Sequence, residues 1–92
     1  MRLQNQIILI TGSTTGIGAA MARLFVKEGA KVILHGRNIE RANALRGELG
    51  PENSAFVQGD LQDPEGPGQI AKEALNCFGR IDCLVNNAAF TT

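Results

Sequence analysis

An apolar run followed by three glycines stands near the start of the chain: Ile7-Ile8-Leu9-Ile10-Thr11-Gly12-Ser13-Thr14-Thr15-Gly16-Ile17-Gly18. Its first four residues form a continuous apolar run rich in β-branched side chains, which is typical of a strand buried on both faces of a parallel sheet. From Ile17 the apolar residues recur at helical spacing and predict a helix that ends near Gly29. The predicted apolar stripe of this helix consists of Ile17, Met21, Leu24 and Phe25. The three glycines therefore lie in a turn between a buried strand and a helix.

The remaining sequence repeats this alternation of strand and helix. Apolar runs predict further strands over residues 32–34, 55–57 and 81–85. A helix capped by Asn38 ends at Gly50-Pro51, and another begins at Asp63-Pro64 or only near Pro67 and ends at Gly79. Such alternation predicts an α/β fold with a parallel sheet. Right-handed crossovers place the first two helices on one face. If the fourth strand returns beside the first, the third helix lies on the other face and the strand order is the Rossmann-like 3-2-1-4.

Composition limits the range of functions. The length of 92 residues predicts one small domain, residues 1–92. Nine basic and nine acidic residues balance, which argues against a nucleic-acid or anionic-membrane partner. The chain shows neither a signal-peptide pattern nor an apolar stretch of about 18 residues, so we expect a cytoplasmic protein with no membrane contact. Cys77, Cys83 and the single histidine, His35, do not have metal-ligand spacing, and we expect no metal site.

The glycine-containing turn has a pattern suited to phosphate. A pyrophosphate approaches the backbone closely only where side chains are absent, and a helix N-terminus offers it unpaired N–H groups. We assign the tight turn to Gly12, the close approach of phosphate to Gly16, and the close contact of helix and sheet to Gly18. An ordinary glycine-rich turn is the alternative, and the flanking strand and helix argue against it.

Three motifs in order along the chain resemble the short-chain dehydrogenase/reductase family. They are the spacing TGxxxGxG in the turn, Asp60-Leu61 after the third strand, and Asn86-Asn87-Ala88-Ala89 after the fourth. The resemblance covers essentially all of the chain, and it implies that residues 1–92 are a partial dinucleotide-binding (Rossmann) domain that is truncated after its fourth strand. It implies that Asp60 hydrogen-bonds the adenine amino group and that the asparagine motif supports the sheet and the nicotinamide side of the site. Ala89 departs from the family's glycine and is a weaker contact candidate.

Each of these polar residues also has a structural alternative. Asp60 would then cap a helix or solvate a loop, and Asn86 and Asn87 would satisfy backbone groups at the ends of strands. For His35, at the end of a strand, a packed and hydrogen-bonded ring is favoured over a catalytic one.

The end of the second strand bears on the choice of cofactor. Dinucleotide-binding proteins that use NAD normally carry an acidic residue about 20 residues past the glycine motif. This chain has His35-Gly36-Arg37-Asn38 there, with no carboxylate. Arg37 offers a planar set of donors to a 2′-phosphate, and Ser13 and Asn38 could add hydrogen bonds, so NADP is predicted over NAD. A solvated loop charge is the alternative for Arg37.

The resemblance implies hydride transfer between a nicotinamide and a carbonyl or alcohol, with a Tyr, a Lys and a Ser as catalytic groups. These lie beyond the asparagine motif in the family, and this sequence contains no tyrosine, so we assign no catalytic residue. We expect the N-terminal cofactor-binding portion of an NADP-dependent oxidoreductase, inactive alone and homo-oligomeric with a small-molecule substrate at full length. The predicted cofactor-binding residues are Gly12, Ser13, Thr15, Gly16, Ile17, Gly18, Arg37, Asn38, Asp60, Leu61, Asn87 and Ala88.

A free-standing dinucleotide-binding or sensor module without catalysis is the alternative function. A Tyr-x-x-x-Lys segment encoded past residue 92 would favour the oxidoreductase, and a natural stop codon would favour the module.

Overall fold

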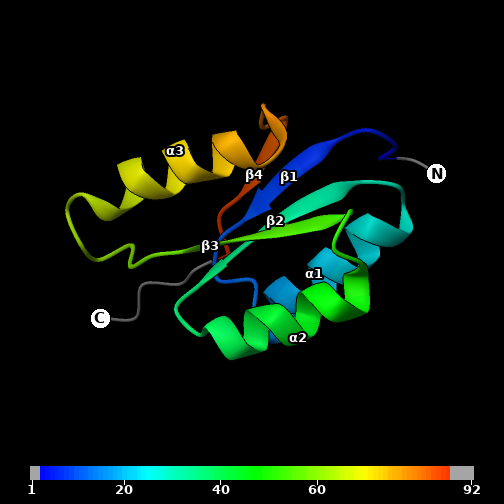
Figure 1. Cartoon of the computed structure of the whole chain (residues 1–92), viewed down its shortest axis with the longest axis horizontal. Coiled ribbons are helices and arrows are strands. Elements are labelled where there is room, and N and C mark those ends of the chain that lie inside the picture. Colours follow the sequence, from blue (N-terminus) through cyan, green and yellow to red (C-terminus); the bar gives the residue numbers. More distant parts are fainter. Residues whose placement is uncertain (1–2, 88–92) are drawn as a thin grey trace.

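Strands and helices alternate along the chain in the computed structural model, which describes residues 3–87 (Figure 1). The strands of the described residues are parallel and form one sheet in the order β3-β2-β1-β4, as predicted. The elements are β1 (Ile7–Ile10), α1 (Gly16–Lys27), β2 (Lys31–Gly36), α2 (Ile39–Leu49), β3 (Ser54–Gln58), α3 (Gly66–Phe78) and β4 (Cys83–Val85).

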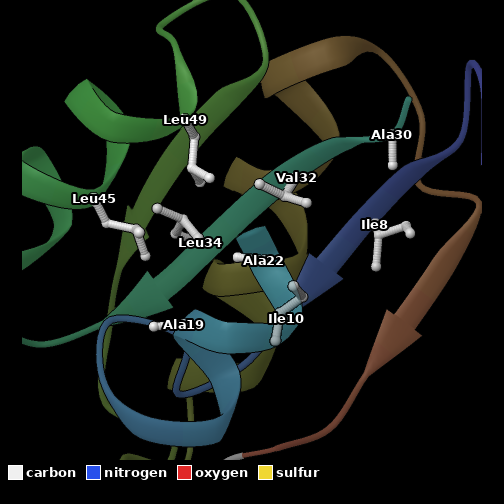
Figure 2. Packing of buried hydrophobic residues seen from close by; sticks show 9 residues of the cluster. All are labelled: Ile8, Ile10, Ala19, Ala22, Ala30, Val32, Leu34, Leu45 and Leu49. Atoms are coloured by element: carbon white, nitrogen blue, oxygen red, sulfur yellow. The ribbon is translucent and has the colours of Figure 1, made fainter. Parts of the chain in front are cut away.

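The continuous apolar run of β1 is explained by two separate core layers. Ile8 and Ile10 pack on the face covered by α1 and α2, whereas Ile7 and Leu9 pack on the face covered by α3. Because successive strand residues point to opposite faces, a strand buried on both sides needs an apolar residue at every position. Figure 1 shows α1 and α2 on one side of the sheet and α3 on the other, and Figure 2 shows the first of the two layers. The prediction of helices on both faces is confirmed.

The predicted apolar stripe of α1 is wrong in two of its four positions. Ile17 is 73% exposed and Leu24 is 54% exposed, and only Met21 and Phe25 pack partly against the core. The buried residues of α1 are Gly18, Ala19 and Ala22. The helix lies against the sheet through its smallest side chains, which allow close approach, so its buried face is rotated away from the larger apolar residues.

The fourth strand is shorter than predicted, because regular pairing begins at Cys83 and not at Ile81. The Ile7 N–H donates to the Asp82 carboxylate (2.9 Å), and the Asp82 N–H donates to the Ile7 carbonyl (2.8 Å). The carboxylate therefore occupies the place that a strand carbonyl would take. Arg80 donates both to Asp82 (3.1 Å) and to the Asn5 carbonyl (2.7 Å), which ties this entry into β4 to the start of β1.

The packing of α1 predicts opposite effects for two substitutions. Ala22→Leu, at a position with no exposed surface, should lower the free energy of unfolding by about 1–3 kcal/mol because it overpacks the helix–sheet contact. Leu24→Ala should change it by only about 0.5 kcal/mol because the side chain is largely exposed. Urea denaturation of both variants measures the two changes. A larger loss of unfolding free energy for Leu24→Ala than for Ala22→Leu would support the predicted apolar stripe, in which Leu24 is buried.

Asp82 gives a prediction about acid stability. The hydrogen bond from the Ile7 N–H, followed by the interaction with Arg80, holds the pKa of the Asp82 carboxyl below its ordinary value. Its stabilising effect is therefore present above the unfolded pKa of about 3.9 and is lost as the pH falls through the lower folded value. Asp82→Ala should lower the thermal midpoint at pH 7, and the gap to wild type should narrow at pH 3. A gap of the same size at both pH values would contradict a charged contact.

Candidate functional site

A cleft of about 240 Å³ lies at the carboxyl ends of β1, β2 and β3. In a parallel sheet these ends share one edge, so the turns that follow the three strands meet there. The cleft brings together five predicted site residues from three distant segments. Its lining residues are Gly12, Thr14, Thr15, His35, Gly36, Arg37, Gly59, Asp60, Leu61 and Gln62.

The glycines of the turn meet different steric demands. Gly12 (φ 61°) and Gly16 (φ 58°) are in the left-handed region, which favours glycine, so the predicted tight turn at Gly12 is confirmed. A Cβ on Gly18 would lie 2.5 Å from the Gly12 carbonyl oxygen, 2.7 Å from the Ser13 Cα and 2.7 Å from the Asn87 amide nitrogen. The close contact predicted for Gly18 therefore exists, with the turn and Asn87 as its partners.

The N-terminus of α1 borders this turn without a side-chain cap. Thr15 occupies the capping position in an extended conformation, its side chain makes no capping hydrogen bond, and the first turn holds no acidic residue. A Cβ on Gly16 would meet no atom within 4 Å, so the space beside Gly16 is open. Exposed N–H groups, a positive helix end and open space together suit an anion.

Ser13 lies beneath the turn and not in the cleft. Its side chain is fully buried, its N–H donates to the His35 carbonyl (2.8 Å), and its hydroxyl accepts from the His35 N–H (2.8 Å). Ser13 thus fastens the glycine turn to β2. The hydroxyl is not positioned for the predicted ligand contact.

His35 connects the turns that follow β1 and β3. Its Nδ1 accepts from the Gly12 N–H (3.0 Å), and its Nε2 lies 3.0 Å from the Gly59 carbonyl oxygen. Burial lowers the pKa of the ring, opposed by the Gly59 carbonyl and the Asp60 charge. The prediction of a packed, hydrogen-bonded histidine is confirmed. Its contact with the glycine turn was missed, because nothing local in the sequence signals that contact.

Arg37 and Asn38 lie just outside β2 and are both exposed. The Gln58 side chain donates to the Arg37 carbonyl (3.1 Å), which braces this backbone against β3. The Asn38 side chain accepts from the Arg41 N–H (3.0 Å), so its predicted role as the cap of α2 is confirmed. Arg37, Asn38 and Glu40 also line a shallow hollow beside the cleft.

The segment after β3 forms the far wall of the cleft. Asp60 is exposed, and one oxygen of its carboxylate accepts from the Gln62 N–H (2.9 Å). This is the loop role described above as the alternative for Asp60. Leu61 packs partly against the core layer beneath α3.

The two asparagines after β4 hold the ends of β1 and β4 together. The Thr11 hydroxyl donates to the Asn86 side-chain oxygen (3.1 Å) and accepts from the Asn87 N–H (3.0 Å). The Asn87 amide donates to the Gly12 carbonyl (3.1 Å). The structural interpretation is therefore confirmed for Asn87, whose amide satisfies a backbone carbonyl, whereas the Asn86 side chain bonds the Thr11 hydroxyl and not a backbone group. Ala88, also predicted to contact a cofactor, lies outside the described residues.

Residues 3–87 hold neither a cluster of metal ligands nor a membrane-spanning helix. This part of the chain contains no group of three or more His, Cys, Asp or Glu side chains placed to hold a metal ion. Cys77 and Cys83 are free thiols, and burial raises the pKa of Cys77. Within the same residues, no helix has the length and apolar character needed to cross a membrane.

The glycine contacts predict contrasting effects of adding one methyl group. Gly18→Ala should lower the free energy of unfolding by about 1–3 kcal/mol, because its nearest neighbours include backbone atoms that have no room to yield. Gly47→Ala, in the exposed interior of α2 with no atom within 4 Å, should raise it by about 0.5–1 kcal/mol through helix propensity. Urea denaturation distinguishes them, and equal effects would mean that Gly18 is not tightly packed.

Known proteins are similar to this chain in sequence. Residues 6–92 match the family model described as short chain dehydrogenase. Over 97% of its length the chain is 38% identical to Dehydrogenase/reductase SDR family member 7B of Rattus norvegicus and 44% identical to sorbitol dehydrogenase of Cereibacter sphaeroides. It spans 30% and 34% of these relatives, respectively.

A solved structure agrees with these sequence matches. The 3-ketoacyl-(acyl-carrier-protein) reductase of Brucella melitensis, complexed with NADH, superposes with a TM-score of 0.82 at 34% identity, over 89% of this chain and 33% of the reductase. The family match, the sheet order and the glycine turn agree, and the chain belongs to the short-chain dehydrogenase family.

Proposed function

We propose that this chain is the cofactor-binding portion of an NADP-dependent oxidoreductase that transfers hydride between a nicotinamide and a carbonyl or alcohol. The observation that carries the proposal is the cleft itself. It combines an uncapped helix N-terminus with an arginine at the end of β2, where no carboxylate occupies the position usual for NAD. Family membership supports the reaction class.

The residues of the cleft fit the parts of a dinucleotide. The pyrophosphate would lie against Gly16 and the N-terminus of α1, where open space and N–H groups are available. The adenine would lie toward Asp60 and Leu61 on the far wall. Ile17, exposed in the first turn of α1, would flank the phosphates, and Asn87 would hold the turn through Gly12.

Arg37 is the residue proposed to select NADP. Its guanidinium provides a fork of donors that matches the oxygens of a 2′-phosphate. The hydrogen bond from Gln58 braces its backbone at the cleft. Glu40 lines the adjacent hollow, and its negative charge would repel the 2′-phosphate. The proposed preference for NADP over NAD therefore requires that Arg37 lie nearer to the bound ribose than Glu40 does.

The bound cofactor would donate or accept the hydride. The residues described here would bind it, orient it, and hold the pyrophosphate at the helix end. With no tyrosine among the 92 residues, the proton donor of the reaction would come from outside this sequence. Activity on a small-molecule substrate, homo-oligomerisation and a cytoplasmic location are proposed for the full-length protein.

Cofactor preference is tested by substitution of Arg37. Arg37→Ala should weaken NADP⁺ binding by about 10- to 100-fold, the range expected for loss of a hydrogen bond to a charged group. Binding of NAD⁺ should change by less than about twofold. Calorimetric titration of both cofactors measures the two dissociation constants.

Arg41→Ala is the matched control, since Arg41 is an exposed arginine of α2 that does not line the cleft. It should leave both affinities near wild type. Tighter binding of NAD⁺ than of NADP⁺ by the wild-type chain would refute the NADP assignment, and no binding of either would refute the proposed function.

A further inference from the structure

His35 is almost completely buried, with 4% of its surface exposed, and both ring nitrogens are engaged. Nδ1 faces the N–H of Gly12, and Nε2 faces the carbonyl of Gly59. One ring therefore bridges the glycine turn after β1 and the loop after β3, which are opposite walls of the cleft.

These two partners require a single protonation state. A backbone N–H can only donate, so Nδ1 must be unprotonated to accept from Gly12. A carbonyl can only accept, so Nε2 must carry the hydrogen. Both bonds are made only by the neutral ring with its hydrogen on Nε2. A proton added to Nδ1 would point at the Gly12 N–H and break that bond.

We propose that His35 is a positioning residue whose neutral ring holds the glycine turn in its cofactor-binding conformation, and that protonation of the ring in mild acid weakens cofactor binding. The inference rests on the proposed function, because it assigns the glycine turn to the cofactor. The link runs through Gly12, whose left-handed conformation aims the turn that leads to Gly16 and α1.

The groups around the His35 ring lower its pKa from the ordinary value. Burial lowers the pKa of His35, and the Gly59 carbonyl and the Asp60 carboxylate partly offset it. Arg37 follows β2 and lines the same cleft as the His35 ring. The first turn of α1 contains no acidic residue that could favour the charged ring. Because the folded pKa lies below the ordinary value of about 6.5, the neutral ring persists at neutral pH. The bond to Gly12 is lost only as the pH falls through that lower folded pKa.

Two variants separate the ring's contacts. His35→Asn places an acceptor near the position of Nδ1 and keeps a partner for the Gly12 N–H, but it does not titrate. His35→Gln places a donor near the position of Nε2 and keeps a partner for Gly59, but it leaves the Gly12 N–H unsatisfied. At pH 7.5, His35→Asn should bind NADP⁺ within about threefold of wild type, and His35→Gln should bind about tenfold more weakly.

The decisive measurement is the ratio of NADP⁺ dissociation constants for the full chain between a pH one unit below the midpoint of the His35 ring, as found by NMR titration of the free protein, and pH 7.5. The 2′-phosphate also titrates near pH 6, so wild type is compared with His35→Asn, in which only the phosphate titrates. The wild-type ratio should exceed that of His35→Asn by about fivefold or more. Equal ratios would overturn the proposal. So would a smaller wild-type ratio, which would mean that attraction between the charged ring and the pyrophosphate outweighs the lost bond.

A readout without cofactor separates this inference from the proposed function. In NMR spectra of the free protein, the Gly12 amide resonance should shift with the same midpoint as the His35 ring and should be independent of pH in His35→Asn. A Gly12 resonance that does not follow the ring would overturn the inference even if NADP⁺ binds. Failure to bind NADP⁺ at any pH, with the Gly12 shift present, would refute the proposed function and leave the His35–Gly12 contact standing.

Discussion

The structure depends on the close approach of α1 to the turn that precedes it, where Gly18 lies against the backbone of Gly12 and Ser13. A side chain at Gly18 would hold the helix away from the turn. With the helix in place, Ala19 and Ala22 pack on the sheet, and Thr15, the N-cap residue of α1, lines the cleft. The same contact therefore serves the core and the proposed phosphate site.

Hydrogen bonds from distant residues hold this turn on each side. Ser13 and His35 attach it to β2, and His35 extends the connection to Gly59 after β3. Asn87 attaches it to the end of β4. Most of these bonds use backbone groups of the turn, which a buried segment must satisfy in any case. The turn is thus fixed by elements that are distant in sequence and adjacent in the sheet.

The family and the fold follow from features that are local in sequence. Apolar runs mark strands buried on both faces, and glycines mark the turn, because these requirements act on neighbouring residues. The exposure of Ile17 and Leu24 was not predictable in this way. Several faces of a helix with many apolar residues satisfy the same periodicity, and the choice among them depends on how closely the sheet approaches. The late start of β4 likewise depends on Asp82 meeting Ile7 across the sheet.

Local patterns along the chain are enough to predict the order of strands and helices, the position of the glycine turn, the lack of a carboxylate directly after β2, and membership of the family. Each of these depends on residue types at short spacing. Which polar side chains face the cleft depends on the packed structure. It buried Ser13 beneath the turn and gave His35 partners in two loops. The physical reason is that the direction of a hydrogen bond is set by partners more than 20 residues away along the chain, which only the packed sheet brings together.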